Sequence, residues 1–295
     1  MRLAHQVLHT GDIVGESIIW SPGEEVLWWV DIVGRRIHRY SPSAQEHRFW
    51  PTPELVSSIG LRRGGGLIVG LRQRVAFWRP GGAFETFAVP EPDLPQNRLN
   101  EGVVAPDGSF WCGTMQNNVA EDGSPKEMTA RTGAIYRITP DGTVTRMTDR
   151  EFGITNTMVW TDDGRFVTAD TLKNRLYQYD VLPSGLGPRR DFGQPLDRGL
   201  PDGSTRDTDG RIYNARVVDG AAIARLSPDG GLEDYFDLPC RAPTSCTFGG
   251  PDLSTLYVTS SRFGLSDDDI RTLPGEGALY ALDVDAAGLP APEFG

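Results

Sequence analysis

The sequence predicts an all-β protein, a six-bladed β-propeller with four antiparallel strands in each blade. The main observation is a repeat of turn glycines between β-rich, aromatic-rich segments, at a spacing of about 42–46 residues that widens where one long loop is inserted. The composition agrees, because 35 Gly and 22 Pro in 295 residues favour many short strands over helices. The alternative, a pair of β-sandwiches, needs no such repeat. The turn positions are Gly23, Gly65, Gly108, Gly164, Gly210 and, in the last repeat, residues 252–255.

Six repeat units follow one another along the chain, and we expect them to form a single propeller domain over residues 1–295. Each unit consists of strands joined by tight turns such as Pro106-Asp107-Gly108. A polar segment without periodicity, residues 116–132, is predicted to be a long loop. The last unit has only three strands, so the N-terminal strand at residues 6–9 is expected to complete it and close the ring. The units lie at residues 18–40, 58–78, 97–138, 157–180, 203–226 and 246–284.

Charge and hydropathy argue against several classes of partner. The formal net charge is −11 and Lys and Arg form no block, which argues against binding to nucleic acid or to an anionic membrane. No apolar segment reaches the roughly 18 residues of a membrane helix, and the N-terminus lacks the apolar core of a signal peptide. Three Cys without a CxxC motif indicate reduced thiols. We expect a cytoplasmic protein, and its oligomeric state stays open.

Polar residues recur at one position of the repeat. Asn100, Asn156 and Asp202 each lie eight residues before a turn glycine, and Glu16 has the same place in the first unit, where the turn is offset by one residue. In the second and sixth units this place falls to Ser57 or Ser58 and to Thr244 or Ser245. The first strand of every propeller blade lines the central channel, so equal phase means equal depth along the axis. The four residues Glu16, Asn100, Asn156 and Asp202 should therefore converge at one mouth of the channel.

These residue types favour a metal site. A single Asp or Asn near a turn is normally a cap, but four in one phase are not explained by capping. Two packed carboxylates repel each other unless a proton or a cation neutralises them. Carboxylate and amide oxygens, without clustered His or Cys, suit a hard divalent cation. Calcium is the first expectation, and zinc, manganese and magnesium remain alternatives.

Five segments together resemble the senescence marker protein/regucalcin–gluconolactonase family, in the family's order and over nearly the whole chain. Members of that family are six-bladed propellers that hydrolyse sugar lactones with one divalent metal ion. The resemblance implies Glu16, Asn156 and Asp202 as metal ligands, and Arg98 and Asn100 as substrate contacts. The segments are GESIIW at residues 15–20, NRLNEGVVAPDGSFWCGTM at 97–115, ITNTMVW at 154–160, LPDGSTRDTDGRIY at 200–213 and PTSCTFGGPDLSTLYVTSS at 243–261.

The chain departs from the family pattern beside the expected site. Glu101 stands where Asp is usual, Ala105 where Asp is common, and Asn118 where some members have Glu. Thr157-Met158 replaces a Gly-Leu pair after Asn156. None of these changes removes an expected metal ligand. We count Asn118 and Glu101 among the substrate-binding residues, because a charge lost from the loop would change which hydroxyl pattern of the substrate is favoured.

The resulting hypothesis is metal-dependent hydrolysis of a sugar aldonolactone to the aldonic acid. The metal would act as a Lewis acid on the lactone carbonyl, and Asp202 would take a proton from the metal-activated water. Loop 116–132 would cover the pocket. The alternatives are a phosphotriesterase-like metal hydrolase on the same fold and a calcium-binding propeller without catalysis. The sequence does not identify the lactone.

Overall fold

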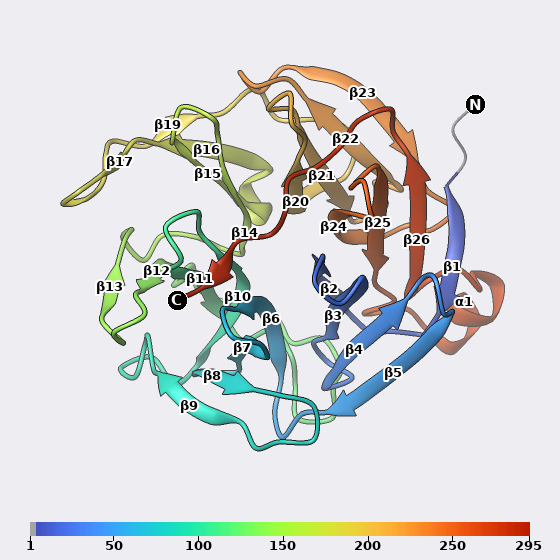
Figure 1. The fold of residues 1–295 in the computed structure, drawn as a ribbon, viewed down its shortest axis with the longest axis horizontal. Helices are drawn as coiled ribbons and strands as arrows, with labels where there is room; N and C mark the ends of the chain where they lie inside the picture. The colour runs from blue at the N-terminus through green and yellow to red at the C-terminus, as the bar shows by residue number, and fades with distance from the viewer. Residues whose placement is uncertain (1–3) are drawn as a thin grey trace.

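The computed structural model describes residues 4–295, and it forms a ring of six β-sheets around a central axis (Figure 1). Every blade contains four antiparallel strands, so the predicted six-bladed propeller is confirmed. Blades 1 to 3 consist of β2 (Gly15–Ser21), β3 (Val26–Asp31), β4 (Arg36–Ser41) and β5 (Glu46–Pro51); β6 (Val56–Arg62), β7 (Leu67–Leu71), β8 (Val75–Trp78) and β9 (Glu85–Ala88); and β10 (Asn97–Val104), β11 (Phe110–Gln116), β12 (Ile135–Ile138) and β13 (Val144–Arg146).

The sixth blade is completed by the N-terminal strand, as predicted. β1 (His5–His9) pairs antiparallel with β26 (Ala278–Asp283), which joins the two ends of the ring. This pairing leaves no open sheet edge where the ring closes. Blades 4 to 6 consist of β14 (Thr155–Trp160), β15 (Phe166–Asp170), β16 (Arg175–Tyr179) and β19 (Arg190–Asp191); β20 (Leu200–Arg206), β21 (Ile212–Val217), β22 (Ala222–Leu226) and β23 (Leu232–Asp237); and β24 (Pro243–Gly249), β25 (Thr255–Ser260), β26 and β1.

The repeated turns form as their glycines suggest. Gly108 and Gly210 have φ values of 77° and 81°, a left-handed backbone that glycine adopts without a steric penalty. Each turn brings the second strand back against the first, as in the pairing of Val104 with Phe110. Apolar side chains of neighbouring blades then pack between the sheets, with Trp29 and Trp111 among the most fully buried.

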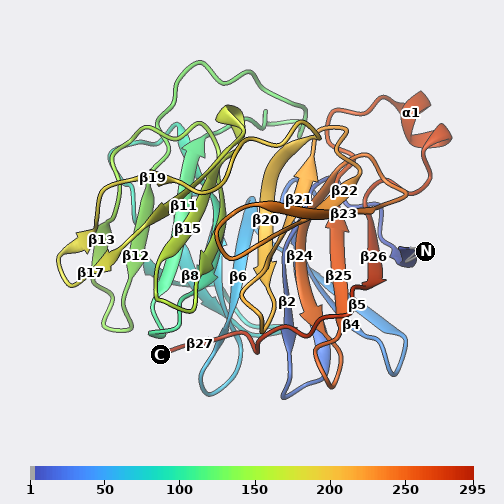
Figure 2. The same ribbon diagram turned by 90° about the horizontal axis from the view of Figure 1, so that it is seen from above.

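Several elements lie outside the predicted repeat. β27 (Glu293–Phe294) adds a parallel strand to β6, so the C-terminal segment crosses the lower face of the ring. Loop 116–132 contains no strand, as expected, and it lies on the opposite face together with α1 (Asp267–Thr272) (Figure 2). None of the helices in residues 4–295 has the length and apolarity to span a membrane. The remaining elements are η1 (Thr171–Lys173) and the hairpin of β17 (Val181–Leu182) and β18 (Gly185–Leu186).

Candidate active site

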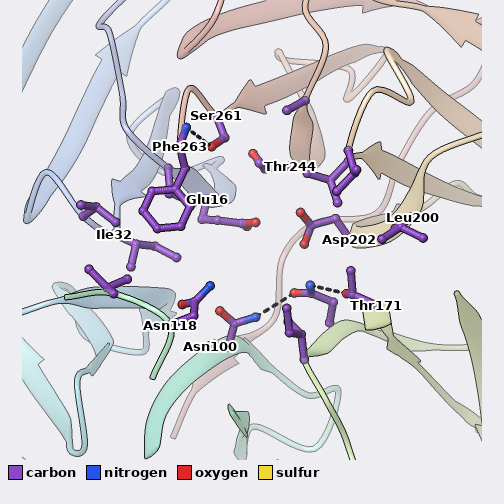
Figure 3. Close-up of a pocket in the computed structure, with 18 of the residues that line it drawn as sticks. Glu16, Ile32, Asn100, Asn118, Thr171, Leu200, Asp202, Thr244, Ser261 and Phe263 are labelled. Carbon is purple, nitrogen blue, oxygen red and sulfur yellow. Dashed lines mark hydrogen bonds between the residues drawn. The ribbon is translucent and has the colours of Figure 1, made fainter. Parts of the chain in front are cut away.

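A cavity of about 380 Å³ opens on the face that carries loop 116–132. The inner strands of five blades and this loop contribute polar side chains to its wall (Figure 3). Among the predicted site residues, the structure brings together side chains up to 186 positions apart in the chain, from Glu16 to Asp202 (202 − 16 = 186). The predicted site residues in the wall are Glu16, Arg98, Asn100, Asn118, Asn156 and Asp202.

A β-bulge positions these side chains. In every blade the pairing of the first two strands breaks at the site position, for example between Glu16 and Ile19 and between Asn156 and Met158. A bulge places an extra residue in one strand and redirects the side chains beside it. Ser17 and Thr157, which follow the site residues, have φ values of 51° and 55°, a conformation that is strained for residues other than glycine.

Amide side chains connect neighbouring blades beneath the cavity. Asn100 Nδ2 donates to Asn156 Oδ1 at 3.1 Å and to the Thr155 carbonyl at 2.9 Å. Asn156 Nδ2 donates to Thr171 Oγ1 at 2.8 Å, and Thr171 Oγ1 donates to the Pro201 carbonyl at 2.8 Å. The chain of hydrogen bonds runs from blade 3 to blade 5. It fixes the orientation of the Asn156 amide, whose oxygen lies on the side of Asn100.

Arg98 is a buried cation with neutral partners. Its guanidinium donates to Asn100 Oδ1 at 2.7 Å, to the Leu99 carbonyl at 2.9 Å and to Asn118 Oδ1 at 2.9 Å. Among residues 4–295 no carboxylate lies close enough to form an ion pair with it. Burial lowers the Arg98 pKa to about 10, and the charges of Glu16 and Asp202 act in the opposite direction. The balancing negative charge is therefore the carboxylate pair in the same cavity.

Glu16 and Asp202 point toward each other across the axis (Figure 3). Their residues are only 8% and 6% exposed. Burial raises both pKa values well above the ordinary range, and repulsion between carboxylates raises them further. Glu16 Oε2 is also held by the Ser17 backbone N–H at 2.9 Å. Two facing carboxylates of this kind require a shared proton or a bound cation to be stable together.

Glu101 occupies a different position from the other predicted substrate contacts. Its side chain is not part of the cavity wall. Its Oε1 accepts the Gly102 backbone N–H at 3.0 Å, and burial raises its pKa to about 7. The Glu101 charge in turn raises the pKa of both Glu16 and Asp202. Glu101 is thus placed to act on the carboxylate pair through its charge.

The donor atoms fit a hard divalent cation. Two buried carboxylates supply negative charge, and the Asn156 amide, whose oxygen accepts from Asn100, belongs to the same cavity wall. Oxygen donors of these two kinds suit calcium or magnesium. The set contains only two acidic side chains, and within the described residues no group of three or more His, Cys, Asp or Glu could hold a metal ion. A cation here would therefore depend on the Asn156 amide and on water or substrate for its other ligands.

Other residues of the wall were not predicted. Phe263 and Ile32 form an apolar side next to Glu16, and Val119 extends it from loop 116–132 (Figure 3). Thr171 follows β15 and anchors Asn156, and Thr244 Oγ1 contacts Thr259 Oγ1 at 3.0 Å. Thr244 is the exception, because the repeat phase placed Thr244 or Ser245 at this position of the sixth unit. The apolar residues lie in loops, where no repeat marks them.

Comparisons with known proteins show which family and which fold the chain shares. Residues 14–262 match the family described as the SMP-30/Gluconolactonase/LRE-like region. A 6-deoxy-6-sulfogluconolactonase of Pseudomonas putida is 32% identical, with 98% of this chain and 97% of that protein covered. A pentonolactonase of Haloferax volcanii is 34% identical, with 97% and 96% covered. A regucalcin structure from Agrobacterium tumefaciens, described as a calcium-binding protein, has a TM-score of 0.90 at 27% identity and covers 98% of this chain and 96% of that one.

Proposed function

Since the chain belongs to the SMP-30/gluconolactonase/LRE-like family, we propose that it hydrolyses a sugar lactone to the open-chain sugar acid with the help of one divalent cation. The observation that carries the proposal is the facing pair Glu16 and Asp202 in the wall of the cavity. Such a pair attracts a cation and offers a carboxylate base beside the place where a substrate would lie.

The substrate class is supported by two independent points. Relatives at 32% and 34% identity over nearly the full chain are named as lactonases of a sulfogluconolactone and of pentonolactones. The cavity of about 380 Å³ is within the usual size range of small-molecule sites. Its wall combines hydrogen-bonding groups with apolar side chains, among them Phe263, Ile32 and Leu200. A sugar lactone has the matching features, hydroxyl groups together with an apolar C–H face.

Glu16, Asn156 and Asp202 would hold the cation. When bound, a divalent cation supplies Lewis acidity toward a carbonyl oxygen and lowers the pKa of a neighbouring water. Asp202 accepts the proton of the attacking water, because its carboxylate is buried and faces the cavity. With the cation bound, Glu16 would stay ionised and balance the positive charge of the cation. The Asn100–Asn156–Thr171 hydrogen bonds fix the orientation of the Asn156 amide, with its oxygen on the side of Asn100.

The substrate hydroxyls would be recognised on the side of blade 3. Arg98 has neutral partners only, so its guanidinium can donate to a substrate oxygen without losing an ion pair. Asn118 orients Arg98 and presents its own amide to the cavity. Asn118 carries no charge, so a substrate hydroxyl there would meet an amide that both donates and accepts. Loop 116–132 keeps bulk water away from this side through the buried Val119.

The test is an assay of a lactone panel after removal of divalent cations. Pentonolactones, hexonolactones and a phosphotriester would be offered to chelated protein, and calcium, zinc, manganese or magnesium would then be restored one at a time. We expect lactone hydrolysis to disappear with chelation and to return with at least one cation, while the phosphotriester stays intact. Undiminished turnover of lactones without metal, or in Asp202→Ala, would contradict the proposal. Calcium binding without hydrolysis of any lactone would instead indicate a binding protein.

A further inference from the structure

A second hollow of about 380 Å³ lies beside the candidate active site, on the outer side of loop 116–132. We call it the basic hollow, because three cationic side chains line it, one each from blade 1, blade 2 and the loop. Blade 1 provides Arg35, blade 2 provides Arg72, and the loop provides Lys126. The other residues in its wall are Pro53, Glu54, Leu55, Asn117, Val119, Ala120 and Glu121.

The three cations of the basic hollow have no acidic partners. Within residues 4–295, the side chains of Arg35, Arg72 and Lys126 take part in no hydrogen bond or ion pair. Glu54 is already engaged, since its Oε1 accepts from Arg74 Nε at 2.8 Å. Glu121 is the one other acid in the wall, so the hollow is positive overall. Arg35, Arg72 and Lys126 are solvent-exposed, and together they form a locally positive site that attracts anions on an otherwise acidic chain with 40 acidic and 29 basic residues.

The basic hollow is coupled to the candidate active site through one side chain. Val119 lines both cavities, and it is buried among the core residues of blades 1 and 2. Asn117 and Asn118 are divided between the two sides, since Asn117 faces the basic hollow and Asn118 faces the active site. The Lys126 backbone N–H donates to the Asn118 carbonyl at 2.7 Å. A ligand that draws Lys126 toward Arg35 and Arg72 would therefore fix the loop segment that carries Asn118.

We propose that the basic hollow binds a phosphate group and that the bound phosphate holds loop 116–132 against blades 1 and 2. Two guanidinium groups and one ammonium group match the several oxygens of a phosphate, with which arginine forms paired hydrogen bonds. The phosphate would belong to inorganic phosphate or to a phosphorylated sugar, for which the volume leaves room. Bound phosphate acts on the loop, and it takes no part in the hydrolytic reaction.

The test is calorimetric titration of the metal-loaded protein with inorganic phosphate and, separately, with glucose 6-phosphate. We expect saturable binding at millimolar concentration or below, and about tenfold weaker binding in Arg72→Gln and in Lys126→Gln. Arg131→Gln is the matched control, because Arg131 lies in the same loop but outside the hollow, and this variant should bind like the wild type. Tighter binding of glucose 6-phosphate than of inorganic phosphate would identify a phosphorylated sugar as the ligand. Equal affinity would identify phosphate alone.

Hydrogen exchange supplies a second measurement that does not depend on activity. Saturating phosphate should slow exchange of the Lys126 amide and its neighbours in the wild type, and should leave the rate unchanged in Arg72→Gln. Absence of saturable binding would overturn the proposal. Binding that persists in both hollow variants but disappears in Asp202→Asn would overturn it as well, because the phosphate would then lie in the candidate active site.

Discussion

Two clusters of buried ionisable groups in this protein look alike in their electrostatics and differ in their surroundings. In the candidate active site, Glu16 and Asp202 have raised pKa values and face each other. In blade 1, Asp12 is 2% exposed and also has a raised pKa, about 7, caused first by burial and then by the charge of Asp31. A raised carboxyl pKa alone therefore does not distinguish a site from the core.

The difference lies in the partners. Asp12 Oδ2 accepts from Trp29 Nε1 at 2.8 Å, and its Oδ1 lies 3.4 Å from His38 Nε2, while His38 Nδ1 is 2.9 Å from His47 Nε2. Within residues 4–295, Asp12 Oδ1 and His38 Nε2 have no hydrogen-bond partner, so protonation of the Asp12 carboxyl, which its raised pKa favours, removes the buried charge. Glu16 and Asp202 have no such partner, come from different blades and open to a cavity. Two carboxylates that face each other in an open cavity, as Glu16 and Asp202 do, indicate a functional site. A carboxyl buried beside an imidazole, like that of Asp12, indicates a structural role.

The largest expected contrast is in catalysis. Asp202→Asn keeps the shape of the side chain but removes the base and one anionic cation ligand, so we expect lactone turnover to fall by about a thousandfold or more. Asp12→Asn should leave kcat and KM within about twofold of the wild type, because its surroundings do not reach the cavity. Steady-state assays on the best lactone of the panel would measure both. Equal losses in the two variants would remove the distinction between the clusters.

A second contrast concerns stabilisation by divalent cations. Binding at a hundred times the dissociation constant stabilises the folded state by about 2.7 kcal/mol, which raises the melting temperature of a chain of this size by about 5 °C or more. We expect this increase in the wild type and in Asp12→Asn, and its absence in Glu16→Gln. Thermal unfolding with and without calcium would be the measurement. A shift that survives Glu16→Gln would place the cation elsewhere.

The pH dependence of stability should separate the members of the Asp12 cluster. The folded-state pKa of Asp12 is raised to about 7, so its contribution to stability is full below pH 4 and is lost as the pH rises toward 7. The folded-state pKa of His38 is lowered to about 3, first by burial, so its contribution is lost as the pH falls from about 6.5. The two slopes have opposite signs and largely cancel in the wild type.

Removing one partner should expose the slope of the other. Relative to the wild type, the free energy of unfolding of Asp12→Asn should rise more steeply with pH between about 4 and 6.5, by at most about 1.4 kcal/mol per pH unit. That of His38→Gln should rise less steeply than the wild type, or fall, over the same range. The other groups of the cluster are Asp31, Arg36 and His47, and the lowered pKa of His47 adds to the rising slope. Urea unfolding at several pH values would measure the slopes, and a flat profile in both variants would contradict the assignment.

The repeat made much of this arrangement predictable. A period of turn glycines fixes where each first strand begins, and so the convergence of Glu16, Asn100, Asn156 and Asp202 followed from counting residues. The bulges were not predictable, because they depend on how two strands pair and not on a residue pattern. The apolar cavity residue Phe263 and the strand β27 were not predicted for a related reason. Each takes its place through contacts between segments far apart in the chain. The bulge also matters for Glu101, whose neighbour Asn100 enters the cavity wall while Glu101 does not.

Glu101 gives the smallest expected effect and connects the two kinds of cluster. Its pKa is raised to about 7 by burial, like that of Asp12, yet its charge acts on Glu16 and Asp202. In Glu101→Gln, one negative charge near the carboxylate pair is lost, so the affinity for a divalent cation should fall about tenfold at pH 8. In the wild type, the affinity for the cation should weaken as the pH drops below about 7, because Glu101 takes up a proton. The Glu101→Gln variant should lack this part of the pH dependence.

The Glu101→Gln variant also tests whether Glu101 contacts the substrate, as the sequence analysis predicted. Because its side chain is not part of the cavity wall, the ratio of kcat/KM between pentonolactones and hexonolactones should change by less than about twofold in Glu101→Gln. Asn118→Glu is the matched comparison, since Asn118 lies in the wall and holds Arg98, and a new carboxylate there should change the ratio by about tenfold. If Glu101→Gln changes the kcat/KM ratio as much as Asn118→Glu does, then Glu101 contacts the substrate. In that case Glu101 both raises the pKa values of the carboxylate pair and takes part in substrate recognition.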